Sequence, residues 1–126
     1  MGEMLDILSD QTGELVSRMM ELSSQRQKVI SQNIANANTP GYKERTVGFE
    51  KKLSEVLEGD WTKSKIESID IVTHKNTQTP GRVDGNNVDI SEELNELMQN
   101  TLKHRLLARA KSTRGDILKR AAKGPQ

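Results

Sequence analysis

The chain has 126 residues, enough for one small domain but too few for a second full core. Only 33% of the residues are apolar, and the aromatic residues are Tyr42, Phe49 and Trp61. Because few large side chains are available for burial, we expect neighbouring subunits to share burial with this chain. Cysteine is absent, which excludes disulfides and cysteine nucleophiles. The net charge of +1 does not by itself indicate nucleic acid or an acidic membrane as a partner.

Charge is distributed unevenly along the chain. Residues 1–14 carry four acidic residues and no lysine or arginine, whereas residues 103–123 carry eight basic residues and the single acidic residue Asp116. We therefore expect the two ends to attract each other, within a subunit or between neighbours. The acidic start lacks a basic region and a continuous apolar stretch, so we expect no cleaved signal peptide of the general secretory type. No apolar run approaches the ~20 residues that a membrane span requires, so we expect no membrane span.

Residues 4–37 have the apolar spacing of one long amphipathic helix, about 34 residues and roughly 50 Å in length. Polar residues such as Arg26 and Asn33 interrupt its apolar stripe, which is typical of a helix-helix seam and not of a water-tight core. The residues expected to pack along this helix are Leu15, Met19, Leu22, Val29, Ile30 and Ile34. The pattern predicts a packing interface.

A sharp turn is predicted directly after this helix. Thr39 precedes a proline and is disfavoured in a helix, so we expect the helix to stop at Asn38. Pro40 and Gly41 supply the central pair of a type II turn. Beyond the turn, residues 42–47 are expected to be extended, residues 49–59 to form a short helix, and residues 69–73 to form a strand.

A second long helix is predicted near the C-terminus. Residues 74–87 are polar and rich in turn formers, and we expect them to be mobile unless a partner holds them. Asp89 can cap the following helix, with Glu92 in the capping-box position. We expect this helix to run to Ala122, with Gly115 as a weak point. Its expected packing residues are Leu94, Leu97, Met98, Leu102 and Leu106.

The expected fold class is therefore mainly α. Long N- and C-terminal helices pair as a helical hairpin or coiled coil, and a small irregular or β-containing segment lies between them. We divide the chain into an N-terminal assembly helix (1–38), a turn with a variable middle segment (39–88) and a C-terminal assembly helix (89–126).

The sequence gives no pattern typical of an enzyme. His74 and His104 each lack a second ligand at metal-binding spacing. Glu92 and Glu93 lie in the first turn of a predicted helix, where acidic residues favour the helix dipole. No nucleotide-binding glycine pattern occurs. We expect no catalytic residues, no cofactor and no metal.

The basic C-terminal helix leaves one alternative open. Clusters of lysine and arginine bind nucleic acid or anionic lipid in other proteins. The basic residues between Lys103 and Lys123 scatter around the helix, and almost no aromatic residue is available to stack on bases. A small nucleic-acid-binding module is therefore the second hypothesis, behind a structural role.

Three closely spaced asparagines mark the end of the first helix. Asn33, Asn36 and Asn38 can bond to the backbone of a neighbour or to the open carbonyls of the last helical turn. A plain helix end requires the turn residues but not these three amides. The segment predicts a specialised turn or assembly motif.

The same segment carries a resemblance to a known family. Residues Ser31 to Lys43, which read SQNIANANTPGYK, resemble the signature shared by flagellar rod and hook proteins near their N-termini. Residues Asp84 to Ile90, which read DGNNVDI, resemble the proximal rod proteins of that family in particular. The family motif covers the positions Asn33, Asn36, Asn38, Thr39, Pro40, Gly41 and Tyr42.

The resemblance implies a structural role in the flagellar basal body. It implies a subunit that is exported by the flagellar type III apparatus without a cleaved signal and polymerises into a rod that transmits torque. The implied partners are itself, other rod proteins, the adaptor between rod and membrane ring, and the export apparatus. The implied location is the rod within the periplasm, and no nucleic acid is expected as a partner.

Overall fold

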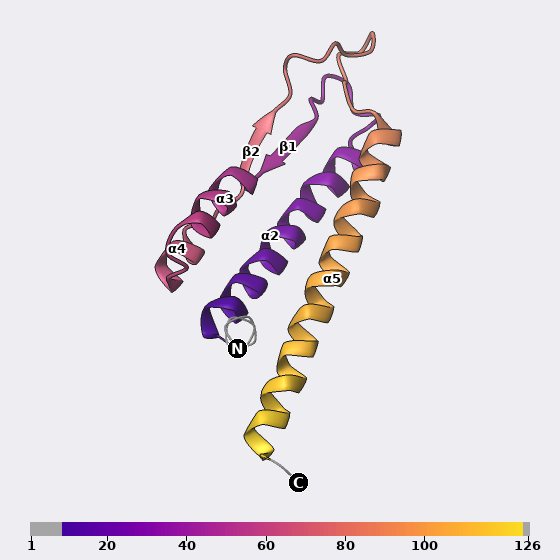
Figure 1. The fold of residues 1–126 in the computed structure, drawn as a ribbon. Coiled ribbons are helices and arrows are strands. Elements are labelled where there is room, and N and C mark those ends of the chain that lie inside the picture. Colours follow the sequence, from indigo (N-terminus) through magenta and orange to yellow (C-terminus); the bar gives the residue numbers. More distant parts are fainter. Residues whose placement is uncertain (1–8, 125–126) are drawn as a thin grey trace.

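The computed structural model describes residues 9–124 and is mainly helical (Figure 1). Helix α2 (Asp10–Ala35) lies between two neighbours: a small lobe made by α3 (Glu50–Glu58) and α4 (Lys63–Glu67), and the long helix α5 (Ile90–Lys123). Strands β1 (Arg45–Gly48) and β2 (Val72–Lys75) join the lobe to the loop at one end of the molecule. The expected fold class, with two long terminal helices around a small middle segment, is confirmed.

Helix α2 is bounded by side-chain caps. The Ser9 hydroxyl accepts a hydrogen bond from the Thr12 amide at 3.2 Å and satisfies one open donor of the first turn. The helix ends at Ala35, so the predicted end at Asn38 is wrong. The Asn36 side-chain amide donates to the Gln32 carbonyl at 2.8 Å and closes the last turn. The helix therefore ends before the position at which Pro40 would force it to end. Met4, the predicted start, lies outside the described residues, but Ser9 is extended, so the prediction of one unbroken helix over residues 4–37 is wrong.

The middle segment contains one antiparallel ribbon and two short helices. Arg45 pairs with Lys75 and Gly48 with Val72, so β2 begins three residues later than the strand predicted at 69–73. Ile69 is instead fully buried beside α4, a helix that the sequence pattern did not predict. Thr62 caps α4 by accepting from the Lys65 amide at 3.3 Å. The short helix predicted for 49–59 is confirmed as α3.

Helix α5 begins where the sequence predicted. Asp89 caps it, with one carboxylate oxygen accepting from the amides of Ser91 at 3.0 Å and Glu92 at 3.4 Å. The helix continues through Gly115 without a break, so the predicted weak point does not interrupt it. It runs antiparallel to α2 (Figure 1). Among residues 9–124, no helix combines the length and the apolar character needed to cross a bilayer.

The main cluster of buried apolar residues lies between α2 and the α3–α4 lobe. Leu15 and Leu22 project from α2 into this lobe. The buried cluster consists of Leu15, Leu22, Val56, Ile66 and Ile69, with Met19, Phe49, Leu53, Trp61 and Ile71 packed around it. Because this core does not include α5, the two long helices are joined by other contacts.

Candidate assembly site

The turn after α2 is closed by its own hydrogen bonds. The Tyr42 amide donates to the Thr39 carbonyl at 3.2 Å, which places Pro40 and Gly41 at the two central positions. Gly41 has φ +75°, the value that a type II turn requires at its third residue. The Thr39 hydroxyl donates to the Asn36 side chain at 3.1 Å and ties the turn to the end of α2. The predicted type II turn is confirmed.

Asn33 clamps the chain that returns from this turn. Its side-chain oxygen accepts from the Arg45 amide at 3.0 Å, and its side-chain nitrogen donates to the Arg45 carbonyl at 2.8 Å. The Tyr42 hydroxyl also donates to the Asn33 oxygen, at 3.0 Å. Asn33 is buried, with 1% of its surface exposed. Its side-chain amide bonds both the N–H and the C=O of Arg45, as the backbone of a paired strand would. The backbone that it holds belongs to its own chain.

The three motif asparagines have different environments. Asn33 binds the returning backbone, and Asn36 binds the Gln32 carbonyl of its own last turn. Asn38 is exposed. The geometry therefore gives two of the three amides a role in shaping the turn and leaves the third on the surface.

Two further asparagines, which sequence reasoning missed as site residues, complete the turn. Asn86 is fully buried and donates to the carbonyls of Asn36 at 2.8 Å and Thr39 at 2.9 Å. Asn87 accepts from the Glu44 amide at 2.7 Å. The chain itself therefore holds residues 84–87, and the expectation that only a partner could hold this loop is wrong. Two adjacent asparagines between a turn and a helix cap were the signal that could have identified them.

Backbone contacts add to the connection between the two segments. The Gly41 amide donates to the Asp84 carbonyl at 2.8 Å. The Lys43 ammonium donates to the Gly85 carbonyl, and the Arg82 guanidinium donates to the Ala37 carbonyl. The two segments that resemble flagellar rod proteins, residues 31–43 and 84–90, thus form one hydrogen-bonded unit, named here the turn unit, although about 40 residues separate them in sequence.

The seam between α2 and α5 is polar. Asn100 is buried and donates to the Ser23 carbonyl at 2.9 Å and to the Gln27 side chain at 2.7 Å. The Ser23 hydroxyl lies 2.7 Å from the His104 Nδ1 atom. Nearer the turn, the Asn33 amide donates to the Glu93 carboxylate at 3.2 Å. The polar interruptions of the α2 stripe therefore serve partly to bond α5.

The expected packing residues of α2 and α5 lie in different environments. In α2, Leu15, Leu22 and Ile30 are buried, while Met19, Val29 and Ile34 are partly buried. Of the five expected packing residues of α5, Leu97 is partly buried and the other four are exposed. The exposed side chains, named here the α5 stripe, are Leu94, Met98, Leu102 and Leu106. The sequence pattern found an apolar stripe on each helix, but the α5 stripe is exposed, and of its members Leu106 lines a hollow with a residue of the α2 stripe, Met19.

Arg26, which interrupts the apolar stripe of α2, makes its polar contacts with the middle segment. Its guanidinium carbon lies 4.4 Å from the centre of the Phe49 ring. The same group donates to the Val47 carbonyl at 3.2 Å and forms an ion pair with Glu50. A charged residue is thus accommodated beside the core by an aromatic ring and a carboxylate.

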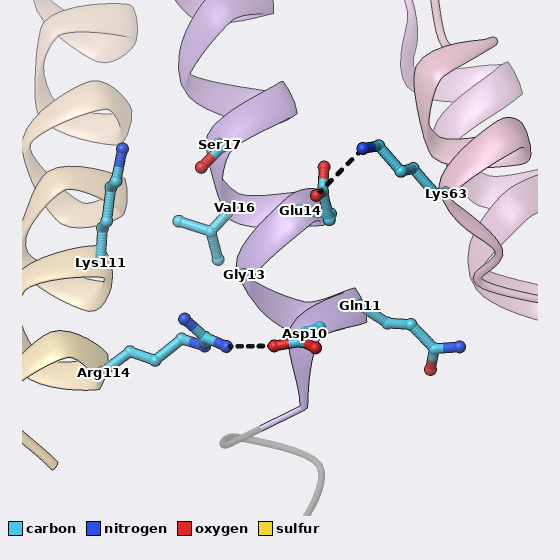
Figure 2. Close-up of a pocket in the computed structure, with 9 residues that line it drawn as sticks. All are labelled: Asp10, Gln11, Gly13, Glu14, Val16, Ser17, Lys63, Lys111 and Arg114. Atoms are coloured by element: carbon cyan, nitrogen blue, oxygen red, sulfur yellow. Dashed lines mark ion pairs between the residues drawn. The ribbon is translucent and has the colours of Figure 1, made fainter. Parts of the chain in front are cut away.

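At the other end of the hairpin, Arg114 of α5 crosses to the first turn of α2, as Figure 2 shows. Its guanidinium donates to the Ser9 carbonyl at 2.9 Å and lies 3.8 Å from the Asp10 carboxylate. Gly13 makes this approach possible, because a Cβ atom there would lie 2.7 Å from the guanidinium carbon. The predicted attraction between the chain ends is thus present in one described pair. Glu3 and Asp6 lie outside the described residues.

Asp10 and Arg114 line a hollow at this end of the hairpin. Across this hollow, Lys63 of α4 lies 4.0 Å from Glu14 of α2 (Figure 2). Lys111 lines the hollow from α5. The acidic groups that line this hollow come from α2, and the basic groups come from α4 and α5. Within residues 9–124, no group of histidine, cysteine or carboxylate side chains has the arrangement of a metal site.

Comparison with known proteins defines the class of this protein. Residues 15–43, which contain the α2 packing residues and the turn, match the model of the flagella basal body rod protein family. The chain is a structural component of the flagellar basal body rod.

Individual relatives define the family within that class. The flagellar basal body rod protein FlgB of Aeromonas hydrophila is 31% identical over 117 residues, which cover 85% of this chain and 89% of that protein. FlgB of Bacillus subtilis (strain 168) is 32% identical over 79% of this chain and 83% of its own length. FlgB of Escherichia coli (strain K12) is 28% identical over 69% of this chain and 75% of its own length. The chain belongs to the FlgB family of flagellar basal body rod proteins.

Proposed function

We propose that this rod subunit assembles by docking the α5 stripe on helices of neighbouring axial subunits, and that the resulting helical tube transmits torque. The observation that carries the proposal is the exposure of this stripe. Met98 is 72% exposed and Leu102 is 60% exposed, in a chain that has few large apolar side chains to bury. An apolar stripe on one long helix is a typical surface for another helix.

The spacing of the α5 stripe suits helix packing. Its members, Leu94, Met98, Leu102 and Leu106, are four residues apart and form a single ridge along the helix. Such ridges fit the grooves of a second helix. Complete burial of one leucine or methionine side chain contributes about 1.5–3 kcal/mol, so a repeated contact of this kind would supply much of the association energy.

The turn unit supports the same role, because a rigid connection fixes where the middle segment leaves the long helix. Asn33, Asn36, Thr39, Pro40, Gly41 and Tyr42 hold that geometry, and the exposed Asn38 is available to a neighbour. The partners that we propose are further copies of this chain, other rod proteins, the adaptor between rod and membrane ring, and the export apparatus. The proposed place of assembly is the periplasm, after export by the flagellar type III apparatus.

The test is complementation of a strain that lacks this gene with a variant carrying Met98→Glu and Leu102→Glu. Both positions are exposed, so the isolated chain should keep its helical circular dichroism and its stability. Two buried carboxylates at a helix interface cost several kcal/mol, so we expect few or no complete rods by electron microscopy and loss of swimming.

The matched control is Ser112→Glu, an exposed position of α5 that is not part of the α5 stripe. It should restore rods and swimming to wild-type levels. Normal rods in the double variant would refute docking through the α5 stripe.

A further inference from the structure

A carboxyl group lies buried between the turn unit and the first turns of α5. The Glu93 residue is only 1% exposed, and its carboxylate accepts from the Asn33 amide at 3.2 Å. Within residues 9–124, no lysine, arginine or histidine forms an ion pair with it. A buried carboxylate without a cation is costly, whereas a protonated carboxyl is not.

The groups around Glu93 are mostly acidic. Glu44, on the segment leading into β1, interacts with Glu93 through its charge and its carboxyl group, and both interactions raise the pKa of Glu93. Glu96, one turn along α5, adds a second negative charge. On the turn side, the charges of Arg45 and Glu93 both act on Tyr42. From α2 the facing group is the uncharged amide of Asn33.

We propose that Glu93 and Glu44 share one proton in the folded chain, and that loss of this proton loosens the connection between α5 and the turn unit. When one carboxyl is protonated, its O–H can donate to the other carboxylate while the Asn33 amide donates to Glu93. When both are ionised, two negative charges face each other in a site without a cation.

The expected titration follows from this geometry. Burial, opposed by the Asn33 hydrogen bond and reinforced by the negative charges of Glu44 and Glu96, raises the pKa of Glu93 from 4.5 to about 7. Burial and the charge of Glu96 also raise the pKa of Glu44. Since the folded chain binds the proton more tightly than the unfolded chain, stability should fall as pH rises from about 4.5 to about 7.

Asn33 bonds Glu93 and also holds Arg45 and Tyr42. Loss of the proton therefore also loosens the point where the middle segment leaves α2. The inference does not depend on which subunits dock on α5. It concerns the stability of one chain, so its failure would leave the proposed assembly surface untouched.

The first experiment compares thermal unfolding of the full chain with that of Glu93→Gln by far-ultraviolet circular dichroism. Glutamine reproduces the protonated carboxyl, since its oxygen can accept from Asn33 and its amide can donate to Glu44. We expect the wild-type midpoint to fall by about 5 °C between about pH 5.5 and pH 8, and the Glu93→Gln midpoint to change much less. At about pH 8 the variant should be the more stable chain.

Glu58→Gln is the matched control, because it removes one exposed carboxylate far from this cluster. It should keep the pH dependence of the wild type. All three proteins contain His74 and His104, so these residues cannot produce a difference between the variants. Equal pH dependence in wild type and Glu93→Gln would overturn the proposal.

The second experiment reads the proton directly through the NMR shifts of ¹³C-labelled glutamate carboxyl carbons. Glu93 should titrate near pH 7, and Glu44→Gln should lower its midpoint by removing the facing negative charge. A Glu93 midpoint near the ordinary value of 4.5 would overturn the proposal. The same holds if that midpoint arises because the isolated chain is not folded at this site.

Discussion

The two faces of helix α2 make different kinds of contact. One face places Leu15 and Leu22 in an apolar core with the α3–α4 lobe, while the adjoining face meets α5 through Ser23 and Gln27. Apolar burial is strong but has little directional preference, whereas hydrogen bonds fix geometry and contribute less net stability. The lobe therefore stabilises α2, and the polar seam sets how α5 lies along it.

This difference explains how α5 keeps its apolar residues for other subunits. If Leu94, Met98, Leu102 and Leu106 faced α2, the hairpin would be more stable as a monomer and would have little surface left for assembly. Hydrogen bonds from Asn100 and His104 instead hold the helix in place with its apolar stripe facing outward. The polar seam is thus compatible with a subunit whose function is to join others.

The largest expected effect belongs to the apolar face. Leu22 has no exposed surface, and Leu22→Ala should lower the free energy of unfolding by about 3 kcal/mol because it leaves a cavity in the core. Urea denaturation followed by circular dichroism measures this loss. The control is Met98→Ala, which removes an exposed side chain and should change stability by less than about 0.5 kcal/mol. A loss below about 1 kcal/mol for Leu22→Ala would contradict the assignment of the core.

The turn unit should show the next largest effect. Asn33→Ala leaves the amide and the carbonyl of Arg45 without the partner that bonds both, at a site that is largely buried. We expect a loss of about 2 kcal/mol by urea denaturation and faster hydrogen exchange at the Arg45 amide. Asn38→Ala, which alters an exposed asparagine of the same motif, should be close to neutral. Equal effects of the two substitutions would show that Asn33 does not clamp the turn.

The polar seam should show the smallest effect. Asn100→Ala removes two hydrogen bonds, but the Ser23 carbonyl keeps its place in the α2 hydrogen-bond ladder and the Gln27 side chain can turn toward water. We expect a loss of about 1 kcal/mol in the free energy of unfolding. A loss as large as that of Leu22→Ala would mean that the seam and the core contribute equally to stability, and the contrast between the two faces of α2 would fail.

Local sequence signals identified most of the elements. The Asp89 cap, the Pro40–Gly41 turn and helix α3 were predicted because each depends on residues that are neighbours in sequence. Signals of this kind failed where a distant contact decides the outcome. The apolar residues at 69–73 alternate as in a strand, but Ile69 contributes to the core and the ribbon begins after it, at Val72.

The site was predicted only in part for the same reason. The motif asparagines were identified, but not their partners, because Asn33 binds a residue twelve positions away and Asn86 binds residues 50 and 47 positions away. Glu93 was assigned to the helix dipole at the start of α5. Its burial could not be read from the sequence, since it depends on where the chain returns after the turn.

The sequence by itself determined that this chain forms two long amphipathic helices, a proline-glycine turn and the motif of a flagellar rod protein. Periodicity and turn chemistry act over a few residues and are visible in one dimension. Only the tertiary structure decided which face of each helix is covered. Leu22 and Met98 have the same helical spacing signal, yet Leu22 is buried and Met98 is 72% exposed, because the α3–α4 lobe covers one and no part of the described chain covers the other.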